Sequence, residues 1–183
     1  MMSVLTITNA SASPYGTTLL QGLNFSLQPG QVLGLIGPNG AGKSTLLHAV
    51  AGGIALDSGQ VLLNGEPLCE YDRVQRARAL AMQSQHAALN FPFSVEEVIL
   101  LGRMPHASGR DMDQQIVEEV LYATDTLPLR QRPYTQLSGG EKQRVQLARA
   151  LAQLWRAQDS PGRLLLLDEP NSALDLAHQR MVM

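Results

Sequence analysis

The sequence Gly37-Pro38-Asn39-Gly40-Ala41-Gly42-Lys43-Ser44-Thr45 matches the pattern G-x-x-x-x-G-K-[ST] at every fixed position. Its three glycines let successive backbone N–H groups turn toward one point, and a helix that begins near Lys43 adds the positive end of its dipole. A loop of this kind binds the phosphates of a nucleotide. We therefore expect all residues from Gly37 to Thr45 to line a nucleotide-binding site.

The segments that flank this loop favour a strand before it and a helix after it. Residues 31–36 are mostly apolar and are predicted to form a buried strand, and residues 46–51 are predicted to continue as a helix that packs on a sheet. In such loops the lysine reaches the β- and γ-phosphates, and the hydroxyl that follows it binds Mg²⁺. Lys43 is thus the predicted phosphate contact, and Ser44 is a predicted Mg²⁺ ligand.

Composition narrows the class of protein. The 183 residues suffice for one domain with a real core, and a net charge of −2 gives no general attraction to nucleic acid. Cys69 is the only cysteine, so an internal disulfide is excluded. The sequence has no apolar run near the ~20 residues of a membrane span and no signal peptide at its start. We expect a membrane role to need a separate membrane partner.

Apolar periodicity and turn signals predict a mixture of strands and helices along the rest of the chain. Strands are expected over residues 4–8, 23–27, 60–65, 79–82 and 164–167, and helices over residues 71–78, 98–101, 111–123 and 143–154. This mixture indicates the α/β class.

A second nucleotide motif follows the apolar strand at residues 164–167. Asp168 ends this strand and is predicted to be a Mg²⁺ ligand beside Ser44, while Glu169 is placed to act as the general base on an attacking water. A strand that ends at a charged turn would explain this stretch alone, but not its combination with the phosphate loop.

Between the two motifs, residues 137–143 read Leu-Ser-Gly-Gly-Glu-Lys-Gln. With this signature the whole chain resembles the nucleotide-binding subunit of ATP-binding-cassette (ABC) transporters. The resemblance implies ATP and Mg²⁺ as cofactors and a single nucleotide-binding domain over residues 1–183. It also implies a phosphate-loop core with a mixed sheet, a small N-terminal antiparallel β region and a helical subdomain inserted at about residues 86–137.

The resemblance also implies a role for individual residues. Tyr15 is expected to stack on adenine, and Gln85 to sense the γ-phosphate side, take part in catalysis and Mg²⁺ binding, and face the membrane partner. Ser138, Gly139 and Gly140 are expected to contact ATP held by the other subunit, and Asp175 to cross the interface of a homodimer. A capping box alone explains the Ser138–Glu141 spacing but not the two glycines. A second open helix N-terminus, in a chain that already has one at its phosphate loop, favours a head-to-tail dimer.

Residues 85–95 and 101–103 resemble the haem (haemin) importer branch, with siderophore and cobalamin importers as the alternative. The resemblance implies an ATPase that drives import from the cytoplasmic face of the bacterial inner membrane. Its partners would be permease subunits and, indirectly, a periplasmic substrate-binding protein, with no nucleic acid. An ABC protein that acts on DNA or the ribosome would carry long coiled-coil insertions or two cassettes, and the printed sequence contains neither.

The family also has a switch histidine, on a further core strand beyond the aspartate that Asp175 matches. The printed sequence reaches Met183 without that strand. We therefore expect a C-terminal truncation relative to the family, which leaves a non-catalytic nucleotide-binding module as a third alternative.

Overall fold

The computed structural model describes residues 3–84, 91–156 and 162–168. These residues form two units along the chain, one from residues 3–80 and 162–164 and the other from residues 81–156 and 165–168. The phosphate loop lies in the first unit, and the Leu-Ser-Gly-Gly signature lies in the second.

The first unit is built on an antiparallel sheet. Its strands are β1 (Leu5–Ala12), β2 (Leu20–Leu27), β3 (Ser58–Leu63) and β4 (Glu66–Pro67), in the spatial order β2-β1-β3-β4. Leu5 and Ile7 of β1 are buried, whereas Thr6 between them is half-buried and Thr8 is exposed. This is the alternation expected of a half-buried strand. The predicted small N-terminal antiparallel region is confirmed.

The helices of this unit follow local start signals. They are α1 (Lys43–Val50), the short 3₁₀ helix η1 (Leu68–Glu70) and α2 (Arg73–Ala79). Asp72 caps α2, because its carboxylate accepts from Gln75 N at 2.7 Å while the Gln75 side chain accepts from Asp72 N at 3.1 Å. The predicted helix start at Lys43 is confirmed.

The predicted strand at residues 31–36 is wrong for this structure. No strand is assigned to these residues, and Val32 and Ile36 are 83% and 98% exposed. A strand exists only when a neighbour supplies hydrogen bonds to its backbone. Among the described residues, β1 to β4 pair with one another and β5 (Leu80–Gln83) pairs with β6 (Leu164–Leu167), so none pairs with residues 31–36.

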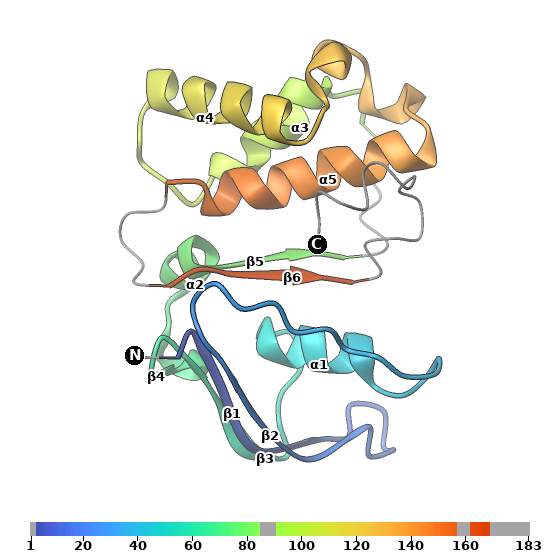
Figure 1. Ribbon diagram of the computed structural model, residues 1–183, viewed down its shortest axis with the longest axis vertical. Helices are drawn as coiled ribbons and strands as arrows, with labels where there is room; N and C mark the ends of the chain where they lie inside the picture. The colour runs from blue at the N-terminus through green and yellow to red at the C-terminus, as the bar shows by residue number, and fades with distance from the viewer. Residues whose placement is uncertain (1–2, 85–90, 157–161, 169–183) are drawn as a thin grey trace. The chain divides into compact units, whose positions relative to one another are not determined.

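The second unit stacks helices on the β5–β6 pair. Its helices are α3 (Val95–Leu100), α4 (Arg110–Ala123) and α5 (Gly139–Leu154), with the 3₁₀ helices η2 (Leu101–Arg103), η3 (Leu127–Leu129) and η4 (Tyr134–Gln136) between them. Within this unit, α5 lies between the two strands and the pair α3 and α4 (Figure 1). The signature helix α5 is therefore the central element of the unit.

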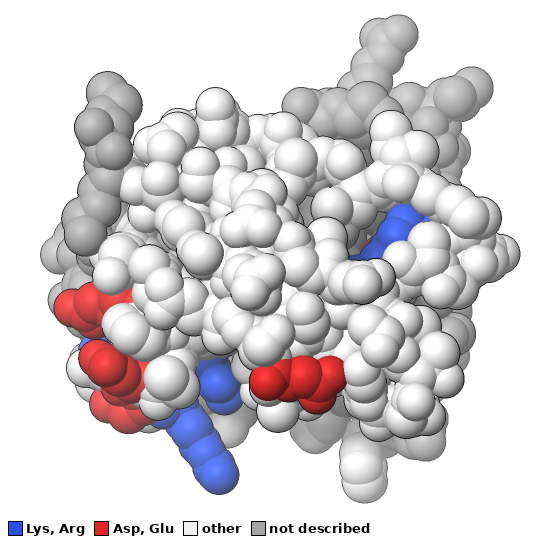
Figure 2. All heavy atoms as spheres, turned by 90° about the horizontal axis from the view of Figure 1, so that it is seen from below, with Lys and Arg blue, Asp and Glu red and all other residues white. Residues whose placement is uncertain are grey.

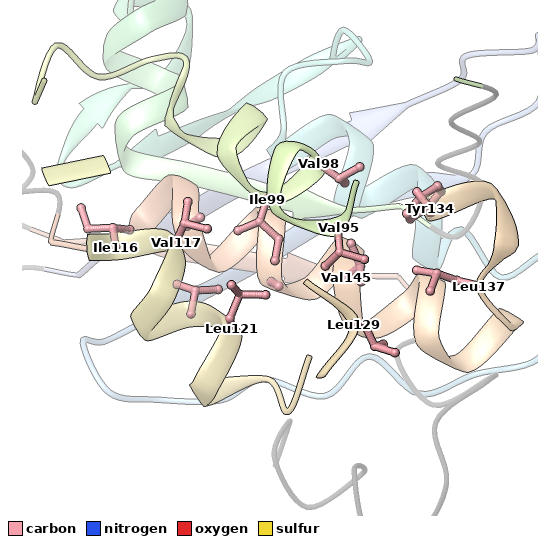
Figure 3. Close-up of a cluster of buried hydrophobic side chains, with 13 residues drawn as sticks. Val95, Val98, Ile99, Ile116, Val117, Leu121, Leu129, Tyr134, Leu137 and Val145 are labelled. Carbon is pink, nitrogen blue, oxygen red and sulfur yellow. The ribbon is translucent and has the colours of Figure 1, made fainter. Parts of the chain in front are cut away.

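Apolar side chains fix α5 on both sides. Toward α3 and α4 it contributes Val145, Ala148 and Ala152 to a buried cluster (Figure 3). The other buried members of this cluster are Val95, Val98, Ile99, Ile116, Val117, Val120, Leu121, Leu129, Tyr134 and Leu137. Toward the strands, Ala150 and Leu154 of α5 pack against Ala81 and Leu165. The predicted helix over residues 111–123 is confirmed as α4.

The described surface is mixed in charge. On the face drawn in Figure 2, side chains of Lys and Arg are few and do not gather in one place, so the described residues of this face form no broad basic surface. None of the described helices has the length and apolar character that a membrane crossing requires.

Candidate functional site

The non-helical part of the phosphate loop ends at Gly42, which directly precedes α1 and has a φ of 87°. This left-handed conformation favours glycine, because a Cβ atom would clash with the backbone. A Cβ atom on Gly42 would also lie 2.7 Å from Leu19 O and 3.3 Å from Leu20 Cδ2, so the end of the connection between β1 and β2 and the first residue of β2 pack directly on the loop. The loop therefore needs glycine here for two independent reasons.

Lys43 holds the loop together in this structure. Its Nζ donates hydrogen bonds to the carbonyl oxygens of Gly37 and Pro38, each at 2.8 Å. The ammonium group therefore lies inside the curve of the loop, where the predicted phosphate contact requires it.

The start of α1 differs from those of α2, α3 and α5. Each of those three helices has a capping box, formed by Asp72, Ser94 and Ser138 respectively, whereas α1 has neither a side-chain cap nor an acidic residue in its first turn. A helix N-terminus whose N-cap residue is a glycine, together with a lysine, favours an anion at this position. Ser44 and Thr45 lie in the same first turn.

Tyr15 lies on the connection between β1 and β2 and is 82% exposed. Leu19 of the same connection packs on Gly42. The exposed ring lies on a segment that contacts the phosphate loop, and its stacking on a base stays a prediction.

Asp168 follows β6 and is buried, at 9% exposed. Its backbone N–H donates to the carbonyl oxygen of Gln83 at 3.1 Å, so the ends of β5 and β6 lie side by side. Residues 164 and 166 are buried and residues 165 and 167 are half-buried, so burial alternates along the strand.

Sequence reasoning assigned no role to Gln83, and the structure gives this residue a distinct one. Gln83 is buried, and its Nε2 donates to the carbonyl oxygen of Gln143 on α5 at 3.3 Å. One side chain thus joins the end of β5, which lies next to Asp168, to the signature helix. Its position at the end of an apolar strand was the signal that could have identified it.

The signature forms the N-terminus of α5. Ser138 is the N-cap residue, and Gly139 and Gly140 are the first two residues of the helix. Glu141 Oε2 accepts from Ser138 N at 2.7 Å, and Ser138 Oγ accepts from Glu141 N at 3.3 Å. The predicted capping box is confirmed.

The same capping box occurs at the start of α3, but the first two amides of that helix have partners that the first two amides of α5 lack among the described residues. There the first two amides of the helix, Val95 N and Glu96 N, donate to the carbonyl oxygens of Arg132 and Arg130 at 3.1 and 3.0 Å. The amides of Gly139 and Gly140 make no such bond to any described residue. A Cβ atom on Gly139 would also meet no atom within 4 Å. The start of α5 is therefore open to an external acceptor in a way that the start of α3 is not.

Gln85, Glu169 and Asp175 lie outside the described residues, so their predicted roles stay predictions. The phosphate loop and Tyr15 belong to one unit, and Asp168 and residues 138–140 belong to the other. The predicted juxtaposition of Ser44 with Asp168 likewise stays a prediction.

Sequence reasoning missed two arginines that organise the second unit. Arg103 is 4% exposed, and its guanidinium donates to Asp113 at 2.9 Å, to Ser108 at 3.0 Å and to the carbonyl oxygen of Ala152 at 2.7 Å. Arg132 pairs with Glu141 at 3.2 Å. Neither contact follows a local spacing rule, because each joins segments that meet only after folding.

Comparisons with known proteins agree with this arrangement. Residues 20–172 match the family described as "ABC transporter". The "Hemin import ATP-binding protein HmuV" of Pseudomonas aeruginosa is 52% identical over 176 residues, which cover 96% of this chain and 68% of that protein. The protein of the same name from Pseudomonas entomophila is 54% identical over 161 residues, or 88% of this chain and 62% of that protein.

Two solved structures have a similar fold. One, described as "an inward-facing conformation of a putative metal-chelate type ABC transporter", has a TM-score of 0.77 and 32% identity over 98% of this chain and 66% of that chain. The other, an "ATP binding subunit of ABC transporter", has a TM-score of 0.82 at 23% identity, covers 98% of this chain and 72% of that chain, and supports the fold alone. The chain spans about two thirds of the length of the curated relatives named above.

Proposed function

The chain belongs to the ABC transporter family, and on this premise we propose that it is the ATP-hydrolysing subunit of an importer whose cargo is haem. The observation that carries the ATPase part is the start of α1. There an N-terminus without a side-chain cap follows a glycine-rich loop that encloses the ammonium group of Lys43. This combination favours the β- and γ-phosphates of a nucleotide over other ligands.

The donor chemistry of three residues fits Mg²⁺. The hydroxyl of Ser44 and the carboxylate of Asp168 are hard oxygen ligands of the type that this ion prefers, and Gln85 adds an amide oxygen. When bound, Mg²⁺ neutralises charge on the phosphates of ATP. Lys43 binds the same phosphates, and Tyr15 stacks on the adenine.

Glu169 acts as the general base. It follows the Mg²⁺ ligand directly in the sequence and takes the proton of the water that attacks the γ-phosphate. Hydrolysis requires the second subunit of a homodimer, whose Ser138, Gly139 and Gly140 contact the γ-phosphate in trans, and Asp175 crosses the dimer interface. The open amides of Gly139 and Gly140 support this role.

The subunit works at the cytoplasmic face of the inner membrane, where it binds separate permease subunits and serves a periplasmic substrate-binding protein. Haem is the favoured cargo, because the relatives at 52% and 54% identity are named for hemin import. A siderophore or cobalamin is the second candidate, since a similar structure at 32% identity is described as a metal-chelate type transporter.

Substitution of Glu169 tests the catalytic part. Glu169→Gln in the full-length protein should retain ATP binding and slow steady-state hydrolysis by roughly 10²–10⁴-fold, which is the scale of a lost general base. The control Glu66→Gln removes an exposed carboxylate of β4 and should hydrolyse ATP at the parent rate. A Glu169→Gln protein that turns over normally would exclude Glu169 as the base, and a parent that binds ATP without hydrolysing it would favour the non-catalytic module.

Reconstitution tests the cargo. The ATPase is purified with an importer permease, placed in vesicles that contain ATP, and supplied with a binding protein loaded with haem, a ferric siderophore or cobalamin. Haem should be the cargo that accumulates and that stimulates hydrolysis. Stimulation by the siderophore or cobalamin alone would replace haem with that cargo.

A further inference from the structure

The carboxylate of Glu141 has two partners at the start of the signature helix. Oε2 accepts from the backbone N–H of Ser138 at 2.7 Å, and Oε1 accepts from Arg132 Nη1 at 3.2 Å. The hydrogen bonds from Ser138 are the main cause of a lowered pKa for Glu141, and the charges of Arg132 and Arg144 lower it further. Glu141 is therefore an anion at neutral pH.

An anion in this place opposes the proposed role of the helix start. A carboxylate one turn into α5 repels a phosphate that approaches the amides of Gly139 and Gly140. The two groups have like charges, and the solvent beside the helix start screens them only in part. The capping box keeps Glu141 in place, so the repulsion has to be offset by a nearby cation.

The helix α3 provides an internal comparison. Its Glu97 occupies the same position in the same type of capping box, with Oε2 2.7 Å from Ser94 N. Among the described residues Glu97 has no ion-pair partner, and the first amides of α3 are already bonded to carbonyl oxygens of the chain. Of these two capping-box carboxylates, the one that pairs with an arginine is thus Glu141, at the open start of α5.

We propose that Arg132 is a positioning residue for the signature: it offsets the charge of Glu141 so that the start of α5 can accept the phosphate of ATP held by the other subunit. This inference rests on the proposed function. It assigns a role to a side chain that lies outside the signature itself and acts through Glu141.

The backbone around Arg132 is held firmly enough for this role. Its N–H donates to the carbonyl oxygen of Leu129 at 2.8 Å, and its own carbonyl oxygen accepts from Val95 N at 3.1 Å. A second guanidinium nitrogen donates to the carbonyl oxygen of Gln136 at 3.4 Å. The side chain is 47% exposed, so the guanidinium stays at the surface beside the helix start.

A double-mutant cycle with a rescue tests the inference. Arg132→Gln, Glu141→Gln and the double variant are made in the full-length protein, and kcat, KM for ATP and the melting temperature are measured for each. Arg132→Gln should raise KM or lower kcat by roughly tenfold, the scale of one uncompensated charge about a helix turn away in a partly screened site. Glutamine at 141 still accepts from Ser138 N, so Glu141→Gln should stay near the parent activity.

The double variant decides between an electrostatic and a structural role. Removing both charges should restore activity to within about twofold of the parent, because nothing then repels the phosphate. A double variant as impaired as Arg132→Gln would overturn the inference. The control Arg156→Gln removes an exposed arginine beyond the other end of α5 and should leave activity unchanged. If the parent itself hydrolyses no ATP, the proposed function fails first and this inference fails with it.

Discussion

A Cβ atom on Gly42 would lie 2.7 Å from the backbone carbonyl oxygen of Leu19, closer than real Cβ atoms approach an oxygen. The last glycine of the phosphate loop thus touches the connection that carries Tyr15. The two parts of the first unit that are expected to hold phosphate and adenine are therefore mechanically linked.

Gly42→Ala should lower both stability and ATP affinity. The left-handed φ of 87° costs a residue with a Cβ atom about 1–2 kcal/mol, and the contact with Leu19 adds about 1–3 kcal/mol of overpacking. Gly30→Ala is the matched control, because Gly30 has a φ of 77° but no atom within 4 Å of its Cβ position. Urea unfolding and equilibrium ATP titration measure the two effects. Equal losses of stability in both variants would show that the contact with Leu19 has no energetic consequence.

Lys43→Ala should abolish detectable ATP binding. The variant removes the only cation that this loop holds among its described residues, so the β- and γ-phosphates lose their charge partner. Isothermal titration with Mg-ATP is the measurement. Arg73→Ala, which removes an exposed cation from the start of α2, should bind as the parent does. Parent-like affinity in Lys43→Ala would remove this loop from the binding site.

Arg103→Met should destabilise the second unit strongly. It leaves the carboxylate of Asp113, which is 19% exposed, without the arginine that lies 2.9 Å away, and it frees the carbonyl oxygen of Ala152. Breaking a buried pair typically costs about 3–5 kcal/mol. Arg156→Met breaks the exposed pair with Glu119 and should cost about 1 kcal/mol or less. Chemical unfolding measures both, and similar values would mean that burial of Arg103 does not strengthen its pair.

Acid should weaken the contact between α3 and the loop before η4. The pKa of Glu96 lies below its ordinary value of 4.5, and the hydrogen bond from Arg130 is the main cause. Burial raises this pKa, whereas the charge of Arg130 and a hydrogen bond from Gln131 lower it further. A carboxyl whose pKa is lower in the folded state stabilises the fold above its unfolded value, and this stabilisation is lost as the pH falls below about 4.5.

Unfolding curves at several pH values check this expectation. Glu96→Gln should be less stable than the parent at neutral pH, and the difference should shrink as the pH drops below about 4.5. Glu70→Gln, an exposed carboxylate of η1, serves as the control for a change in total charge. A stability difference that is independent of pH would contradict the role given to the Glu96 carboxylate.

Local signals in the sequence located most of the elements and much of the site. The capping box at Ser138 located the start of α5, and the glycine-rich loop located the start of α1. These features depend on residues within one turn of each other, so the order of side chains along the chain is enough to specify them.

Tertiary structure decided what depends on partners far away in the chain. Residues 31–36 have the composition of a buried strand, yet no described strand pairs with them, because strand formation requires a neighbour as well as apolar side chains. The pair of Arg132 with Glu141 and the bonds of Arg103 to Ala152 likewise join segments that only folding brings together. The sequence alone determined the family and the phosphate-binding chemistry, whereas packing determined which charges surround the signature helix and hold it in place.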